Sequence, residues 1–220
     1  AGLTWSNALQ SFSTARMRGI CLADENLCIA VGDSSGKGMI FRSSDGGVTW
    51  AVKLRRVGVL LEDCCFITPD SGFAVGGSSA LLRTSNGGQS WSTVTGLPVS
   101  SGFAAIHFVT HRIGTIVGTG GAILRTGDGG MTWGNQTNSA YGLALQDVHF
   151  ASPDTGLAVG QLGTVLRTVN GGALWSKINT GIAQSFNGVA FADARHAVIV
   201  GSNATLLRSS DYGATWSAIP

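Results

Sequence analysis

The chain has 220 residues, 33 of them glycine, with only 12% charged residues and a net charge of +2. Sparse charge and frequent glycine favour many short strands joined by tight turns and argue against long solvated helices. The small net charge gives no indication of a nucleic acid partner, and no apolar run approaches the ~18 residues of a membrane-spanning helix, so we expect no direct membrane insertion. The chain begins at Ala1 without a Met or a signal peptide, so we expect a mature or trimmed form whose leader is not present.

Residues 3–6 match the ending of a phrase that then recurs five times along the chain. The phrase reads RSSDGGVTW, RTSNGGQSW, RTGDGGMTW, RTVNGGALW and RSSDYGATW, at residues 42–50, 83–91, 125–133, 167–175 and 208–216. The closing tryptophans are 41, 42, 42 and 41 residues apart, a period typical of propeller blades. The copy at residues 3–6 is either a strand that completes the last blade or a sign that the chain is cut from a longer array.

Each repeat is expected to form four short strands. In the fourth repeat we expect them at about 146–150, about 156–160, about 163–168 and from near Leu174 onward. Short turns between them permit only antiparallel neighbours, so each repeat is a four-stranded meander. We therefore predict an all-β fold, a five-bladed β-propeller of four-stranded antiparallel blades with residues 1–220 as a single domain. A solenoid of stacked hairpins is the alternative.

The recurring turn is an Asp box, and its residue types favour a structural role. Its acceptor side chains are Asp45, Asn86, Asp128, Asn170 and Asp211, and its tryptophans are Trp50, Trp91, Trp133, Trp175 and Trp216. A short Asp or Asn side chain accepts hydrogen bonds from backbone amides two or three residues later, which fixes a tight turn. A metal ligand or a catalytic acid would need the charge that Asn lacks. We expect the tryptophans to be buried near the outer turns, each N–H finding a backbone acceptor.

Five arginines share one register of the repeat and have two interpretations. They are Arg42, Arg83, Arg125, Arg167 and Arg208. They are either an anion-binding ring or half-buried struts that bond turn carbonyls, and we favour the struts because functional sites usually break repeat symmetry.

The fourth repeat resembles the photosystem II stability and assembly factor family of cyanobacteria and plastids. The likeness rests on Asp-Val-His-Phe at 147–150, Gly-Leu-Ala-Val-Gly at 156–160, Gly-Thr-Val-Leu-Arg-Thr at 163–168 and Asn-Gly-Gly at 170–172, and it extends over all five repeats. It implies a non-enzymatic, extracytoplasmic scaffold, in the thylakoid lumen or the periplasm, that binds a protein and helps assemble a membrane protein complex, with no cofactor and no metal. The partner implied is a membrane-protein segment of a photosystem, and a monomer is expected. Family members have seven blades, whereas this chain has five repeats.

Two other classes of function remain as alternatives. Asp boxes also occur in sialidases and other glycan-processing or glycan-binding propellers, and a structural module of a larger secreted protein is the third hypothesis. The two glutamates, Glu25 and Glu62, are predicted on opposite faces, so they do not form the ~5–10 Å carboxylate pair of a glycosidase. Exposed loop aromatics would favour glycan binding, and only Phe103 and Tyr141 are candidates. We therefore predict no enzymatic activity.

The charges that break the repeat symmetry indicate a binding face. Six basic residues of the first two blades are predicted to lie in connections on one face: Arg16, Arg18, Lys37, Lys53, Arg55 and Arg56. The segment 33–38 in the same region is longer than its counterparts. Acidic residues collect at the turns of the opposite face. We expect the basic face to bind an acidic or membrane-associated protein segment, with an affinity that falls as salt rises.

One register of the inner strands contains Cys21, Cys65, His107, His149 and Ala190. Sulfur with imidazole is a zinc or copper ligand set, but the close local spacing of real metal sites is missing, so we favour small side chains that fill the space between blades. Cys21 and Cys28 flank a short turn, which offers a disulfide as a further alternative.

Overall fold

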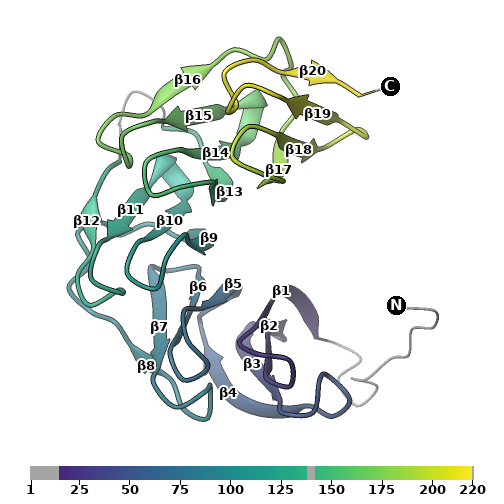
Figure 1. The fold of residues 1–220 in the computed structure, drawn as a ribbon. Helices are drawn as coiled ribbons and strands as arrows, with labels where there is room; N and C mark the ends of the chain where they lie inside the picture. Colours follow the sequence, from purple (N-terminus) through teal and green to yellow (C-terminus); the bar gives the residue numbers. More distant parts are fainter. Residues whose placement is uncertain (1–14, 138–141, 220) are drawn as a thin grey trace. The chain divides into compact units, whose positions relative to one another are not determined.

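The computed structural model describes residues 15–137 and 142–219, so the expected extra strand at residues 3–6 and the loop aromatic Tyr141 lie outside the described residues. The described chain contains twenty strands in five sheets, each with four antiparallel strands (Figure 1). No helix of the described residues is long and apolar enough to cross a membrane. The described residues divide into two compact units, the first ending at Thr95 and the second beginning at Gly96.

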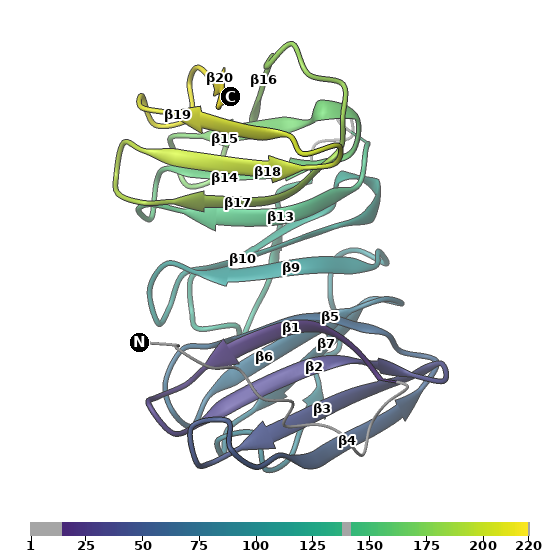
Figure 2. The same ribbon diagram turned by 90° about the vertical axis from the view of Figure 1, so that its right-hand side faces the viewer.

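The first unit contains two sheets. Sheet 1 consists of β1 (Arg16–Leu22), β2 (Cys28–Ser34), β3 (Lys37–Ser43) and β4 (Ala51–Val57). Sheet 2 consists of β5 (Leu61–Phe66), β6 (Gly72–Gly76), β7 (Ala80–Thr84) and β8 (Ser92–Thr93). The two sheets stack face to face (Figure 2), and Ile29, Val31 and Ile40 of sheet 1 share one apolar core with Leu61, Ala74 and Leu82 of sheet 2.

The second unit contains three sheets. Sheet 3 consists of β9 (Phe103–Phe108), β10 (Gly114–Gly118), β11 (Ile123–Thr126) and β12 (Gly134–Asn135). Sheet 4 consists of β13 (Leu145–Phe150), β14 (Gly156–Gly160), β15 (Val165–Thr168) and β16 (Ser176–Ile178). Sheet 5 consists of β17 (Phe186–Phe191), β18 (Ala197–Gly201), β19 (Leu206–Ser209) and β20 (Ser217–Ala218). Short 3-10 turns, η2 (Thr119–Gly121) and η4 (Gln161–Gly163), join the second and third strands of sheets 3 and 4.

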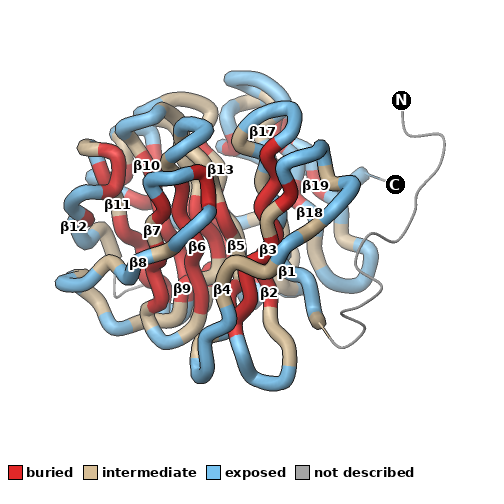
Figure 3. Tube along the Cα trace, turned by 90° about the horizontal axis from the view of Figure 1, so that it is seen from below, coloured by how far each residue is buried: buried red, intermediate tan, exposed pale blue. Residues whose placement is uncertain are grey.

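The second strand of sheet 4, β14, is buried on both faces because sheets 3 and 5 of the same unit pack on either side of it. Every residue of β14 is buried, as is every residue of β6 and of β10, which are labelled beside red segments in Figure 3. The glycines that bracket β14 permit close packing: a Cβ on Gly160 would lie 2.1 Å from the carbonyl oxygen of Ala144, and a Cβ on Gly156 would lie 2.5 Å from the ring of Phe150. The expected strands of the fourth repeat match β13 to β16, with their ends shifted by one or two residues.

Candidate protein-binding surface

The Asp-box turns are held by side-chain hydrogen bonds that can be followed atom by atom in the third repeat. The carboxylate of Asp128 accepts hydrogen bonds from the Thr132 hydroxyl at 2.6 Å, the Thr132 amide at 3.0 Å and the Met131 amide at 2.9 Å. The hydroxyl of Thr126 donates to the same carboxylate at 2.8 Å and accepts from the Gly130 amide at 2.9 Å. The hydrogen bonds from these donors hold the pKa of Asp128 well below its usual range, and the bond from the Thr132 hydroxyl has the largest effect.

Asparagine makes the corresponding contacts in two repeats without a charge. The side-chain oxygen of Asn86 accepts from the Ser90 amide at 3.0 Å, and that of Asn170 accepts from the Leu174 amide at 2.9 Å. An amide oxygen therefore replaces the carboxylate oxygen in the turn, which supports a structural interpretation of the box.

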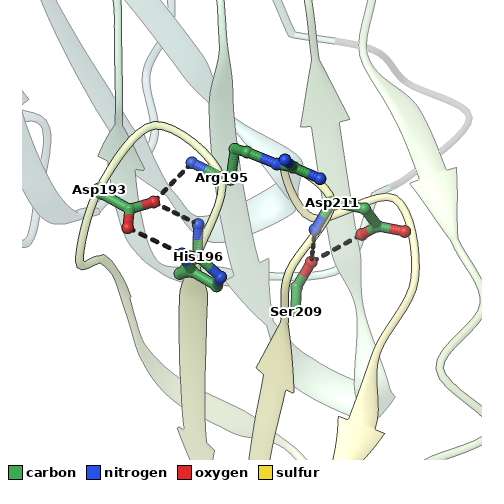
Figure 4. Close-up of polar contacts among 5 residues, drawn as sticks. All are labelled: Asp193, Arg195, His196, Ser209 and Asp211. Atoms are coloured by element: carbon green, nitrogen blue, oxygen red, sulfur yellow. Dashed lines mark hydrogen bonds and ion pairs between the residues drawn. The ribbon is translucent and has the colours of Figure 1, made fainter.

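A second turn, between the first and second strands of each sheet, lies against the Asp box. In sheet 5 (Figure 4), Asp193 accepts from the amides of Arg195 and His196, both at 2.8 Å, and contacts the His196 ring nitrogen Nδ1 at 2.7 Å. The amide of Tyr212, inside the Asp box, donates to the Arg195 carbonyl at 2.9 Å. Hydrogen bonding, chiefly from the His196 ring, lowers the pKa of Asp193 to about 2. The acidic groups of Asp193 and Asp211 at this end are engaged in their own turns (Figure 4).

Three of the repeated arginines join a sheet to a turn of the next sheet. The Nε of Arg42 donates to the Gly87 carbonyl at 2.7 Å, and the Nε of Arg167 donates to the Tyr212 carbonyl at 2.8 Å. Arg125 donates to the Pro153 carbonyl, and its guanidinium lies 4.4 Å from the centre of the Phe150 ring. Backbone carbonyls thus occupy these guanidinium groups, which supports struts over an anion-binding ring.

The Asp-box tryptophans are less uniform than the repeat predicts. Trp133 and Trp175 are buried, whereas Trp50, Trp91 and Trp216 are half-buried. In these three, the indole N–H donates to the carbonyl of the box glycine three residues earlier, at 2.9, 3.2 and 3.1 Å. Burial of all five rings is therefore wrong, because three rings remain at the edges of their turns.

The predicted basic residues lie on strands, not in connections as expected. The segment 33–38 is a hairpin in which β2 and β3 continue to a two-residue turn, Ser35–Gly36, with φ of 50° and 74°. Such a turn suits the twist of paired strands, so the hairpin extends sheet 1. Strand β4 follows it for seven residues, whereas the outermost strands of the other sheets have two or three residues.

The strand pairing places the ends of the four strands of sheet 1 in one row. Arg16 lies opposite Asp33, Asp33 opposite Gly38, and Gly38 opposite Arg56. Directly opposite residues of antiparallel strands share a face, so Arg16 and Arg56 are on the same face, about 15 Å apart at three strand spacings. Arg55 occupies the next row and the opposite face.

Four of the six basic residues are exposed at one end of sheet 1, two on each of its faces. We call Arg16, Lys37, Arg55 and Arg56 the basic end of sheet 1; all four are exposed, and they make no ion pair with the described residues. Arg56 donates to the Thr93 hydroxyl of sheet 2 at 2.7 Å.

The other two basic residues are separated from the basic end of sheet 1 by their contacts or position. Arg18 pairs with Asp33 and with Glu62, both at 2.9 Å, so two carboxylates compensate its charge. The hydrogen bond that Arg18 donates to Asp33 is the main cause that raises the Arg18 pKa. Lys53 is half-buried at an irregularity in the pairing of β3 with β4. The repeat pattern of the sequence indicates neither these ion pairs nor this irregularity.

The inner-strand cysteines and histidines meet in pairs within each unit. In the first unit the sulfur atoms of Cys21 and Cys64 are 2.9 Å apart, and none of the four cysteines is in a disulfide. Cys28 lies opposite Leu22 on β1, so the alternative Cys21–Cys28 bridge is not the arrangement found. In the second unit the rings of His107 and His149 are 4.3 Å apart. The described residues contain no group of three or more His, Cys, Asp or Glu side chains placed to hold a metal ion.

The five four-stranded antiparallel sheets with Asp-box turns define a repeat protein of the β-propeller class, which confirms the expected fold class. A solved β-propeller domain of the WD40 type, from Doa1, matches 93% of this chain and 68% of that chain, with a TM-score of 0.71 and 12% identity. More particularly, residues 89–181 match the family model described as photosynthesis system II assembly factor YCF48, so the chain is a BNR-repeat propeller similar to that family.

Two further solved structures share this fold. YCF48 bound to a D1 peptide is similar over 93% of this chain and 81% of that chain, with a TM-score of 0.65 and 18% identity. A GH74 enzyme from Niastella koreensis is similar over 92% of this chain and 38% of that chain, with a TM-score of 0.71 and 18% identity. No curated protein matches the chain. At these identities the solved structures establish the fold alone.

Proposed function

We propose that the chain is a non-enzymatic scaffold that binds an acidic protein segment at the basic end of sheet 1 and helps assemble a membrane protein complex. The observation that carries the proposal is a group of exposed cations on sheet 1 that make no ion pair with the described residues, on a sheet whose fourth strand is longer than those of the other four described sheets. The match of residues 89–181 to an assembly-factor family supports the same class of function.

The geometry of the basic end suits an extended ligand. Lys37 and Arg55 lie on one face of sheet 1, and Arg16 and Arg56 lie on the other face, at the two edges of the sheet. Their charges are spread over about 15 Å, which is four to five residues of an extended peptide at ~3.3 Å per residue. A segment with several acidic side chains would meet more than one cation, and exposed pairs of this kind weaken as salt screens them.

The charged residues of the first unit also support binding over glycoside hydrolysis, although GH74 enzymes share the fold. Glu62 is paired with Arg18 near the start of β1, whereas Glu25 lies in the turn beyond the other end of that seven-residue strand. The two glutamates are thus separated by about 20 Å of strand, too far for the ~5–10 Å separation of a glycosidase pair.

The relative that carries a D1 peptide suggests the partner and the compartment. We infer that the natural ligand is a lumen-exposed segment of a photosystem membrane protein, that the chain acts as a monomer in the thylakoid lumen or the periplasm, and that the Asp boxes with their tryptophans are structural.

The test is peptide binding by charge-reversed variants. The probes are a fluorescent D1 peptide and an acidic peptide of the same length, titrated with the full chain at low and at high salt, with anisotropy as the readout. The double variant Arg55→Glu/Arg56→Glu should weaken binding roughly tenfold at low salt, a loss that shrinks at high salt. Thermal unfolding should change little, because both side chains are exposed and the variant loses one exposed hydrogen bond, from Arg56 to the Thr93 hydroxyl.

The matched control is Lys177→Glu on β16, an exposed cation of the second unit. It carries one change of the same sign and should leave the affinity for both peptides unchanged. Equal affinity of the double variant and the wild type would refute the basic end of sheet 1 as the binding surface. If Lys177→Glu weakened peptide binding as much as the double variant does, the loss of affinity could not be assigned to the basic end of sheet 1.

A further inference from the structure

We propose that Cys21 and Cys64 are an oxidative modification site, at which a disulfide joins sheet 1 to sheet 2. Their sulfur atoms are 2.9 Å apart, on β1 and β5 respectively, and 43 residues separate them in the chain. A disulfide bond is about 2.0 Å long, so the sulfurs need to approach by less than 1 Å. This inference is independent of the peptide-binding proposal.

The two thiols meet because of how side chains alternate along the inner strands. Strands β1 and β5 are neighbours within the first unit, and Cys64 belongs to the apolar core between the two sheets, with Cys21 packed against it. Cys64 lies on the face of β5 that points back to sheet 1, whereas the adjacent Cys65 points the other way. The Sγ of Cys64 also donates to the Ile29 carbonyl at 3.6 Å, which fixes its position beside β2.

The pair is asymmetric in its access to solvent. Cys21 is half-exposed, whereas Cys64 is 4% exposed. The contact with Cys21 and burial raise the pKa of Cys64 well above its usual value. Cys21 is therefore the thiol that meets an external oxidant first, and Cys64 is the thiol that closes the bridge.

The reaction with a small disulfide such as oxidised glutathione balances as two exchanges. The Cys21 thiolate attacks one glutathione sulfur, which breaks the glutathione disulfide and releases one glutathione thiolate. The Cys64 thiol then loses its proton and attacks the Cys21 sulfur, forming the Cys21–Cys64 bond and releasing the second glutathione. The two protein thiols are oxidised by two electrons, one glutathione disulfide is reduced, and the two protons end on the two glutathione thiols.

The other two cysteines are poorly placed to compete. Cys28 is 5% exposed and lies opposite Leu22. Cys65 is on the far face of β5, and its thiol contacts the Phe66 carbonyl at 3.8 Å. Oxidation should therefore yield one bridge of defined connectivity.

The bridge would restrict the unfolded chain, because it closes a loop of 43 residues that spans most of sheet 1 and the start of sheet 2. Loops of this length give substantial stabilisation, and for a chain of this size we expect Tm to rise by roughly 5–10 °C. An oxidising compartment would keep the bridge formed, and a reducing one would open it.

The experiment uses the full reduced chain, freed of reductant, incubated with oxidised glutathione, and alkylated. Intact mass should show two alkylated thiols instead of four, and Tm should rise on oxidation and return on reduction. Cleavage at Asp24 or Glu25 separates Cys21 from Cys28. Because no protease separates Cys64 from Cys65, the variant Cys65→Ser assigns the linked peptide: it should still contain a Cys21–Cys64 bridge.

Cys21→Ser is the variant that removes the bridge at a half-exposed site, so that it keeps the test open even if a change at buried Cys64 prevents folding. It should show no linked peptide and no rise in Tm with oxidised glutathione. Four alkylated thiols in the oxidised wild type, a stable glutathione adduct on Cys21, or a bridge lost in Cys65→Ser would each overturn the assignment.

Discussion

Acidification should destabilise the second unit through His107, and the variant His107→Asn should remove that sensitivity. Burial lowers the pKa of His107 from 6.5 to about 4, with smaller effects from His149 and Arg125. The folded state therefore holds the ring neutral, with its centre 4.3 Å from that of the His149 ring at a tilt of 36°, and with its Nδ1 accepting from the Phe150 amide at 3.4 Å. Asparagine keeps an acceptor near the position of Nδ1 but does not titrate.

The direction and the size of this change in stability follow from the pKa of His107 in the unfolded chain and in the folded chain. Between pH 6.5 and about 4 the unfolded chain binds a proton at this site that the folded chain does not, so stability is intact above pH 6.5 and is lost as the pH falls. Each unit of pKa difference corresponds to 1.36 kcal/mol, so the wild type should lose about 2.5 kcal/mol at this site between pH 7 and about pH 4.5. Three aspartates affect the stability mainly below pH 3.8, their pKa in the unfolded chain, because folding lowers their pKa values to about 2: Asp45, Asp193 and Asp211.

The assay is urea unfolding followed by tryptophan fluorescence at a series of pH values. The free energy of unfolding of His107→Asn should fall less steeply with acid than that of the wild type, by about 2.5 kcal/mol over this window. His149, whose pKa burial also lowers, remains in the variant and accounts for the slope that is left. The control is His111→Asn in an exposed turn, which should retain the wild-type slope. Parallel curves for His107→Asn and the wild type would refute the reasoning.

Three further changes test the packing and the turns. Gly160→Ala should lower the free energy of unfolding by about 1–3 kcal/mol or prevent folding, because the new Cβ would lie 2.1 Å from a backbone carbonyl oxygen. The control Gly127→Ala, whose Cβ would have no atom within 4 Å, should be close to neutral in the same urea assay. Asp128→Ala should lower Tm, measured by calorimetry, because four hydrogen bonds lose their acceptor. Asp128→Asn should lower Tm less, and equal losses in the two variants would contradict the interpretation that an uncharged amide oxygen can replace the carboxylate in this turn. Trp175→Ala should lower the free energy of unfolding by about 3–5 kcal/mol, because Trp175 is 2% exposed. The control is Leu174→Ala, at a residue 61% exposed, and an equal loss of stability in the two variants would show that the Trp175 ring adds little to the core.

Much of the architecture could be predicted because it is encoded locally and five times over. The phrase from arginine to tryptophan fixes each turn through contacts within about six residues, as the Thr126–Asp128–Thr132 bonds show. The second strands could be placed because a run such as 156–160 is apolar and bracketed by glycine. Strand number, strand order and turn chemistry thus follow from the sequence.

The candidate site was predicted only in part, because it depends on strand register and on contacts between sheets. The basic residues were expected in loops, whereas a two-residue hairpin turn continues the strands and puts Arg55 and Arg56 on opposite faces. The sequence predicted that Arg18 belongs to the binding face, yet Asp33 from the next strand and Glu62 from the next sheet compensate its charge.

The sequence by itself determined the repeat, the four-stranded sheets and the Asp-box turns, since each arises from residues close together in the chain. Only the tertiary structure decided which side chains face one another across two sheets. Cys21 shares a repeat register with Cys65, yet it meets Cys64, because alternation along β5 turns Cys64 toward sheet 1. A shift of one residue reverses every such contact, and no local pattern records the register between one sheet and the next.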